Sequence, residues 1–142
     1  MIDFKILVVD ANILFSFFKK DSLRRELIER LPEYGCKLIS PDYVIAELLN
    51  EKEKIMKFSG IDEIGFLFII SLIQKKVETI SKENYEKWLD DAMKISPHKK
   101  DVPYLALALA SNAAVWSDER AFKKQNKVKI FSTEELKKIL YE

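Results

Sequence analysis

The sequence predicts an α/β protein, a three-layer α/β/α sandwich with a mostly parallel central sheet of four to five strands. Short runs rich in Val, Ile and Leu alternate along the chain with longer stretches of helical periodicity, which is typical of a parallel sheet covered by helices. The first run, at 4–9, is almost continuously apolar, as in a strand buried on both faces. No linker-like segment and no internal repeat interrupts the 142 residues, so we expect one domain over 1–142.

The first half of the chain predicts two strands and three helices. The strands are expected at 4–9 and 37–40, and the helices at 21–31, 41–57 and 62–75. Asp21 or Ser22 stands near the start of the first helix. Pro41 and Asp42 open the second helix, in which 44–49 carries an apolar stripe at helical spacing.

The second half predicts three more strands, at 77–80, 113–116 and 128–131. Helices are expected at 81–94 and 103–112, in a short piece at 119–125, and from Ser132 to the C-terminus. Helix 103–112 is apolar nearly all round, which favours a central, packed position. Ser132 and Glu135 fit a capping box, a signature of a helix N-terminus.

The composition is typical of a soluble globular protein. Lys and Arg number 24 and Asp and Glu 23, so the net charge of +1 does not by itself indicate a nucleic-acid binder. Cys36 is the only cysteine, which excludes an intramolecular disulfide and a Cys-based metal site and favours a cytoplasmic setting. The N-terminus lacks a signal-type segment, and the apolar stretch 64–73 is far shorter than the roughly 20 residues of a membrane-spanning helix. We therefore expect no membrane association.

Acidic residues adjoin the predicted junctions between strands and helices. They are Asp10, Glu47, Asp101, Asp118 and Glu119. Three of them have an ordinary structural explanation: Asp10 and Asp101 would cap helices, and Glu47 would lie on a solvated helix flank. In a parallel sheet, however, the strand-to-helix junctions lie at one edge, so the whole set of acids is expected to converge there.

Converging carboxylates have a specific chemistry. They repel one another and are stabilised by a divalent cation, and Mg²⁺ prefers oxygen ligands. Ions in such sites hydrolyse phosphodiesters by holding the phosphate and activating water. His98 is the only histidine and the three glycines are scattered, which disfavours a Ser-His-Asp site and a Gly-rich phosphate loop. The residues therefore indicate Mg²⁺ or Mn²⁺ and phosphodiester hydrolysis.

Four segments occur in an ordered set along nearly the whole chain. They are VVDANIL at 8–14, PDYVIAELLN at 41–50, KKDVPYLALALA at 99–110 and WSDERAF at 116–122. This set resembles the PIN domain family, whose fold is a small α/β/α sandwich and whose usual activity is metal-dependent ribonuclease. The resemblance implies that Asp10, Glu47 and Asp101 coordinate the metal. It also implies that Asn12 supports Asp10, and that Ser117 is a hydroxyl residue beside a fourth acid.

The fourth acidic position departs from the family pattern. Counted back from Phe122, the family's acid falls at Glu119, while Asp118 is its neighbour. Ala121 stands where a second acid is frequent in the family. Register favours Glu119, whereas Asp118 has the commoner side chain, so either residue would serve as the fourth acid.

Basic residues near these acids are candidates for phosphate contacts, which position a nucleic-acid strand without reading its sequence. They are Lys99, Lys100, Arg120, Lys123 and Lys124. The alternative is that they only form a solvated face.

The resemblance implies a Mg²⁺- or Mn²⁺-dependent endoribonuclease that cleaves RNA, similar to the toxin components of toxin–antitoxin pairs. A small antitoxin protein and a second copy of the chain are the expected partners, and the segment 66–73 would supply an interface if it is not simply core. The alternative is a catalytically weak or inactive PIN-like scaffold that binds RNA or a protein, favoured by the irregular fourth acid. A phosphatase with Asp10 as nucleophile is disfavoured, because Asn12 stands where such enzymes usually have a second Asp.

Overall fold

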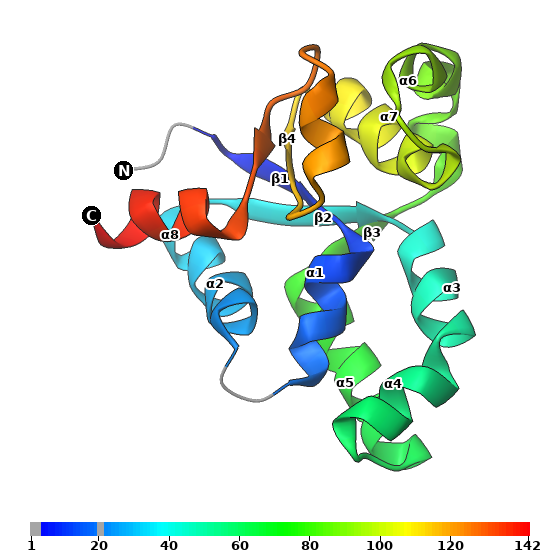
Figure 1. The fold of residues 1–142 in the computed structure, drawn as a ribbon, viewed down its shortest axis with the longest axis vertical. Helices are drawn as coiled ribbons and strands as arrows, with labels where there is room; N and C mark the ends of the chain where they lie inside the picture. Colours follow the sequence, from blue (N-terminus) through cyan, green and yellow to red (C-terminus); the bar gives the residue numbers. More distant parts are fainter. Residues whose placement is uncertain (1–3, 20–21) are drawn as a thin grey trace.

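A sheet of five parallel strands forms the centre of the molecule (Figure 1). The computed structural model describes residues 4–19 and 22–142. The strands are β1 Ile6–Val9, β2 Lys37–Pro41, β3 Glu78–Ile80, β4 Ala114–Trp116 and β5 Ile130–Phe131. Their order in the sheet is β3-β2-β1-β4-β5, and every neighbouring pair is parallel. The predicted α/β class with a parallel sheet is therefore confirmed.

Helices cover both faces of this sheet. The α-helices are α1 Ala11–Phe15, α2 Leu23–Arg30, α3 Tyr43–Asn50, α4 Lys52–Ser59, α5 Glu63–Lys76, α6 Leu89–Ile95, α7 Val102–Ser111 and α8 Thr133–Tyr141. Figure 1 shows α6 and α7 on one side of the sheet and α1, α2 and α5 on the other. The side chains of Leu7, Val8 and Val9 point alternately to the two faces, yet all three are fully buried. Both faces of β1 are therefore packed, as in the predicted three-layer sandwich.

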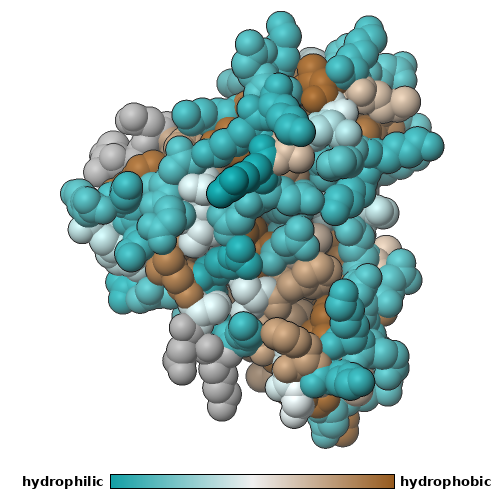
Figure 2. Space-filling view, in the orientation of Figure 1, coloured by the Kyte–Doolittle hydropathy of each residue, from teal (hydrophilic) through white to brown (hydrophobic). Residues whose placement is uncertain are grey.

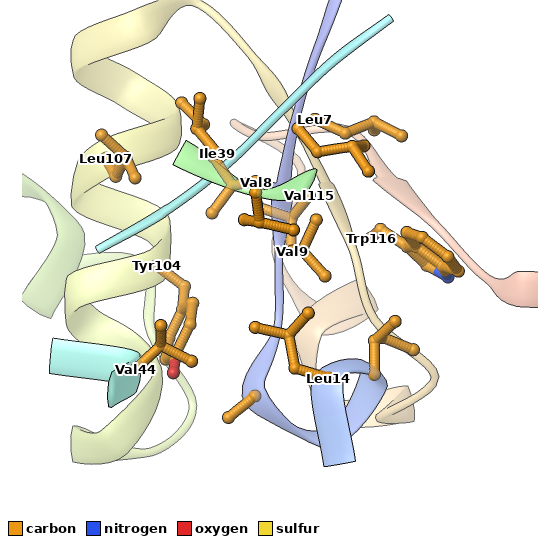
Figure 3. Close-up of a cluster of buried hydrophobic side chains, with 14 of the residues drawn as sticks. Leu7, Val8, Val9, Leu14, Ile39, Val44, Tyr104, Leu107, Val115 and Trp116 are labelled. Carbon is orange, nitrogen blue, oxygen red and sulfur yellow. The ribbon is translucent and has the colours of Figure 1, made fainter. Parts of the chain in front are cut away.

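The core is built from the sheet and the two helical layers (Figure 3). Leu107 of α7 lies beside Ile39 of β2, and Leu14 of α1 lies at the other end of the cluster, below Val9. Helix α7 buries most of its circumference, as its apolar sequence predicted. Within residues 4–19 and 22–142, every helix is too short or too polar to cross a lipid bilayer.

The chain path creates one special position on the sheet. From β1 the chain adds β2 and β3 on one side, and then crosses back to add β4 and β5 on the other. Strand order therefore reverses between β1 and β4, and in open α/β sheets the crevice beyond the carboxyl ends of such strands is where ligands bind. Asp10 follows β1 at this position, and Ser117 follows β4.

Two predicted helices are shorter and more broken than expected. The helix expected at 41–57 is two helices, because Glu51 leaves helical geometry with φ −95° and ψ 10° between α3 and α4. Pro41 ends β2 and does not begin a helix. The helix expected at 81–94 begins as two 3₁₀ turns, Lys82–Asn84 and Glu86–Trp88, before α6. The rest of the 3₁₀ turns in the described ranges are Ser16–Phe18, Leu31–Tyr34, Lys99–Asp101 and Arg120–Lys124.

Other elements differ mainly in their ends. Helix α1 and the turn after it occupy 11–18, which the predicted ranges leave out, and they bury Ile13, Leu14 and Phe17 against the core. The strand expected at 128–131 pairs only over Ile130–Phe131. Ser22 caps α2 by accepting a hydrogen bond from the Arg25 N–H at 3.1 Å, whereas Asp21, the other candidate for its start, lies outside the described residues.

The capping box at the start of α8 is confirmed. The Ser132 hydroxyl accepts a hydrogen bond from the Glu135 N–H at 3.1 Å, and the Glu135 carboxylate accepts one from the Ser132 N–H at 2.9 Å. This box fixes the start of the helix that follows β5, and Thr133, its first residue, donates two hydrogen bonds to Asp118.

Candidate functional site

Asp10 lies at the carboxyl end of β1 with its side chain turned toward β4. Its backbone N–H donates to the Trp116 carbonyl at 3.1 Å, which continues the β1–β4 ladder by one residue. The Ser117 hydroxyl donates to Oδ2 of Asp10 at 2.8 Å, and the side chain of Asp10 makes no capping contact with α1. Only 5% of Asp10 is exposed. Side-chain capping therefore does not explain this acid, and Ser117 fixes its orientation.

Asp101 lies at the start of α7 and is buried more deeply, with 2% exposed. Its side chain does not cap α7 either. Among the described residues, no hydrogen-bond partner contacts its Oδ2. A buried carboxylate oxygen without a partner is costly, and such an atom in a native fold calls for an explanation such as an ion.

Glu47 projects from α3 and is half-buried. The Tyr104 hydroxyl, from α7, donates to its Oε1 at 2.5 Å. Burial, and then the charge of Glu47, raises the pKa of Tyr104, so this hydroxyl stays protonated and remains a donor. Sequence reasoning missed Tyr104 because it lies in an apolar helix. Its position three residues after Asp101, on the same helix face, was the available signal.

Glu119 follows β4 and joins the same group of acids. Its Oε1 lies 3.2 Å from Nζ of Lys100, and its backbone N–H donates to the Ser117 hydroxyl at 3.0 Å. The negative charge of Glu119 contributes to raising the pKa of both Asp10 and Asp101. The structure thus brings Glu119 together with the acids of β1 and α7.

Asp118 belongs to a different network. Its Oδ2 accepts from Arg24 of α2, with Nη2 at 2.7 Å, and from the Thr133 hydroxyl at 2.5 Å. Its Oδ1 accepts from the Thr133 N–H at 2.7 Å, and Nε1 of Trp116 donates to the same Thr133 hydroxyl at 3.1 Å. Burial raises the pKa of Asp118, but the hydrogen bonds from Thr133 and Arg24 outweigh burial and lower it. Asp118 therefore ties the loop after β4 to α2 and α8.

The pKa values of the grouped acids reflect their burial and mutual repulsion. Burial is the largest cause that raises the pKa of Asp10 and of Asp101 to about 6 each, and neighbouring carboxylates add to it. The hydrogen bond from Ser117 acts in the opposite direction on Asp10. Burial also raises the pKa of Glu47, against the hydrogen bond from Tyr104. In water near neutral pH, this edge of the sheet therefore concentrates negative charge that the fold itself only partly neutralises.

The donor set suits a hard divalent cation in an open site. All the grouped side chains carry carboxylate oxygens, which Mg²⁺ and Mn²⁺ prefer, and Oδ2 of Asp101 is a buried oxygen with a lone pair to offer. In the described ranges, 4–19 and 22–142, no three Asp, Glu, His or Cys side chains are grouped closely enough to hold a metal ion together. Mg²⁺ does not require such a cage, because it usually keeps several waters and binds through one or two carboxylates.

The remaining candidate residues lie around this group. Asn12 is exposed on α1, and no hydrogen bond joins its side chain to Asp10 in the described part of the chain. Of the basic candidates, Lys100 forms an ion pair with Glu119, one of the grouped acids, while Lys123 forms an ion pair with Glu135 of α8. The other basic candidates are exposed, namely Lys99, Arg120 and Lys124.

Neutralising the two neighbouring acids after β4 should have different effects on the stability of the fold. Asp118→Asn loses charge-assisted hydrogen bonds to Arg24 and Thr133, so we expect its free energy of unfolding to fall by about 1–3 kcal/mol. Glu119→Gln loses one partly exposed ion pair with Lys100 and relieves repulsion among the acids, so its stability should stay within about 0.5 kcal/mol of the parent or rise. Urea denaturation of the metal-free protein near neutral pH measures both. Equal destabilisation of the two variants would contradict this assignment.

The raised pKa values of Asp10 and Asp101 predict a pH dependence of stability. Their pKa of about 6 in the folded protein exceeds the ordinary value of 3.8, so between these two values the folded protein binds more protons than the unfolded chain does. The free energy of unfolding therefore falls as the pH rises from about 4 to above 6. In EDTA, the Tm of the parent should therefore fall between about pH 5 and pH 7, whereas that of Asp101→Asn should fall less and end higher. The matched control is Asp91→Asn, at an exposed position of α6, which should follow the parent. A parent Tm that rises over this range, with Asp101→Asn parallel to it, would refute the claim.

Comparison with known proteins agrees with the fold. One similar structure is a chain from the crystal structure of VapBC2 from Rickettsia felis bound to a DNA fragment from the VapBC2 promoter. This chain superposes on the present protein with a TM-score of 0.67. The two share 15% identity, and the match covers 89% of this chain and 98% of that one, so the likeness shows a shared fold. No curated protein matches the chain. The family model of the PIN domain matches residues 8–140, and the chain belongs to the PIN domain family.

Proposed function

We propose that this chain is a metal-dependent endoribonuclease that hydrolyses RNA phosphodiester bonds with Mg²⁺ or Mn²⁺. The observation that carries the proposal is the pair of buried acids at the β1–β4 edge, Asp10 and Asp101, of which Asp101 has a buried oxygen without a protein partner. Two buried acids side by side at a ligand-binding edge supply the oxygen donors that a divalent cation prefers. Membership of the PIN domain family, whose usual activity is metal-dependent ribonuclease, supports the same reaction.

Each acid has a proposed role in this site. Asp10 and Asp101 would hold the ion, and Glu47 and Glu119 would contribute further oxygens to the ion or to its waters. A bound ion in such a site neutralises charge on the phosphate and lowers the pKa of its bound water. We assign the fourth position to Glu119 in preference to Asp118, because Asp118 is already engaged by Arg24 and Thr133.

The neighbouring polar residues would orient these acids and the substrate. The Ser117 hydroxyl donates a hydrogen bond to Asp10, and the Tyr104 hydroxyl donates one to Glu47. Hydrogen bonds of this kind commonly orient the side chains that bind a metal ion. Lys100, which pairs with Glu119 in the protein alone, would become available to a substrate phosphate once Glu119 engages the ion.

A non-catalytic scaffold that binds RNA or a protein is the second candidate. It is favoured by the open arrangement of the acids and by Ala121, which stands where a second acid is frequent in the family. The two candidates differ in a property independent of turnover. A nuclease should bind Mn²⁺ saturably and lose this binding in Asp10→Asn, whereas a scaffold should show no saturable binding.

The central prediction concerns cleavage of RNA. Asp10→Asn and Asp101→Asn should stay folded yet cleave at least about a hundredfold more slowly, because each removes charge that holds the cation. EDTA should abolish cleavage by the parent, and Mn²⁺ or Mg²⁺ should restore it. Cleavage of several labelled RNAs, followed on gels, measures these effects, with Asp91→Asn as an exposed acid that should cleave like the parent. Cleavage that survives both substitutions would show that the acids are assigned wrongly.

We further propose that the protein acts in the cytoplasm as the toxin of a toxin–antitoxin pair, bound by a small antitoxin protein and forming a homodimer. The fold shared with a VapBC2 chain supports this setting. Helix α5 supports an interface: it buries Phe66, Ile70 and Ile73 but leaves Ile64, Leu67 and Phe68 largely exposed. One face of α5 therefore belongs to the core, and the opposite, exposed apolar face is the candidate interface.

The homodimer is testable on that exposed face. Light scattering of the parent at micromolar concentration should give twice the mass of one chain. Leu67→Lys together with Phe68→Lys should give a monomer, because burial of these side chains drives the association. Asp91→Lys, at an exposed position of α6 on the other side of the sheet, should remain dimeric. A monomeric parent would exclude the homodimer, and a dimeric double variant would exclude this face.

A further inference from the structure

One cation of the protein itself reaches the acidic site. The acids of this site are Asp10, Glu47, Asp101 and Glu119. Lys100 directly precedes Asp101 in the 3₁₀ turn before α7, and its Nζ lies 3.2 Å from Oε1 of Glu119. Among the ion pairs within residues 4–19 and 22–142, this pair alone includes an acid of the site. The site therefore contains a positive charge supplied by the chain.

The side chain of Lys100 acts on several of these acids and not on Glu119 alone. Lys100 and Glu47 line the same cavity, although they come from distant parts of the chain. Burial is the largest cause that raises the pKa of Glu47 and of Asp101, and the charge of Lys100 acts in the opposite direction on both. In return, the hydrogen bond and the charge of Glu119 raise the pKa of Lys100, against a small effect of burial. One ammonium group therefore partly neutralises acids from α3, from the start of α7 and from the loop after β4.

A divalent ion at this site would need the same oxygens as the ammonium group. Oε1 of Glu119 is already paired with Lys100, and Mg²⁺ and Mn²⁺ prefer carboxylate oxygens. Two cations that share carboxylates also repel each other, and the ion has twice the charge of the ammonium group. The side chain of Lys100 is 57% exposed, and Figure 2 shows mainly hydrophilic side chains at the surface where β1 leads into α1. The ammonium group is therefore free to move into water when an ion binds.

We propose that Lys100 is a built-in counter-ion of the acidic site, which a divalent ion must displace from Glu119 in order to bind. The lysine thereby lowers the affinity of the site for the ion and stabilises the fold when no ion is bound. The proposal rests on the metal-dependent function proposed above. It adds to that function a residue of this chain that determines how much free ion the site needs.

The charge at position 100 predicts a graded series of affinities for Mn²⁺. Lys100→Gln removes the competing charge and should bind Mn²⁺ about two- to fivefold more tightly, the range that corresponds to the interaction of an exposed charge pair. Lys100→Glu should bind at least as tightly as Lys100→Gln, whereas Lys100→Arg keeps the charge and should bind like the parent. Isothermal titration calorimetry of chelator-treated protein measures these dissociation constants without any turnover.

A lysine at the other end of β1 supplies the matched control. Lys5 is exposed and directly precedes Ile6, the first residue of β1, whereas the acids lie beyond the carboxyl end of this strand. Lys5→Gln changes the net charge by the same amount as Lys100→Gln, and it should bind Mn²⁺ like the parent. An equal gain of affinity in both variants would reveal an effect of net charge alone and would overturn the role of Lys100.

A double-mutant cycle tests whether Lys100 acts through its ion pair. Glu119→Gln removes the carboxylate charge that holds the ammonium group at the site. In the Glu119→Gln background, Lys100→Gln should therefore raise the affinity for Mn²⁺ by a smaller factor than in the parent, because residues in contact are coupled. The same factor in both backgrounds would mean that the ion does not displace Lys100 from Glu119.

The stability of the ion-free protein gives a second measurement. In EDTA, Lys100→Gln leaves the acids without their counter-ion, so its Tm should lie about 1–4 °C below that of the parent. Saturating Mn²⁺ should then raise the Tm of Lys100→Gln by more than it raises the Tm of the parent, because the variant binds the ion more tightly. Lys5→Gln should follow the parent under both conditions.

The results separate this proposal from the function on which it rests. Mn²⁺ binding by Lys100→Gln that equals that of the parent would overturn the proposal. Weaker binding would also overturn it, and would show that the lysine instead holds Glu119 in position for the ion. In both cases, saturable binding by the parent that is lost in Asp10→Asn would leave the metal-dependent function standing. A parent that binds no Mn²⁺ saturably would reject that function, and the counter-ion with it.

Discussion

Repulsion between buried carboxylates at the switch point of the sheet is the constraint around which this molecule is organised. Asp10 and Asp101 are almost fully buried, and burial together with neighbouring charge raises the pKa of each to about 6. A fold without a ligand gains nothing from such an arrangement, because ionised acids in a low-dielectric setting destabilise it. The surrounding contacts nevertheless hold the acids in place: Ser117 orients Asp10, and the Tyr104 hydroxyl orients Glu47. A cation at this edge would turn the repulsion into attraction.

The two adjacent acids after β4 have different surroundings in the fold. Asp118 accepts hydrogen bonds from Arg24 of α2 and from Thr133 at the start of α8, so its charge is compensated and it anchors the loop. Glu119, one residue later, turns to the opposite side and joins the acids. Successive residues in extended chain point in opposite directions, so anchoring one side chain to the helical layer directs the next toward the crevice.

Local and topological signals in the sequence predicted much of this structure. Apolar runs predicted the parallel sheet, and parallel topology predicted that acids at its junctions would meet. The break at Glu51 was not predictable, because the apolar periodicity of the sequence continues across it to Ile55. The partnership of Asp118 with Arg24 spans 94 positions along the chain, and that of Glu47 with Tyr104 spans 57. No spacing rule reaches over such distances, so the sequence alone did not show that the two acids after β4 have different partners.

Anomalous diffraction from crystals soaked in Mn²⁺ would show whether the buried acids form a cation site. We expect a manganese peak within coordinating distance of Asp10 and Asp101, with Glu119 turned toward the ion or its waters. Asp118 should keep its hydrogen bonds to Arg24. The absence of a peak at this edge under saturating Mn²⁺, or a peak held by Asp118 with Arg24 displaced, would mean that the buried acids are not the cation site.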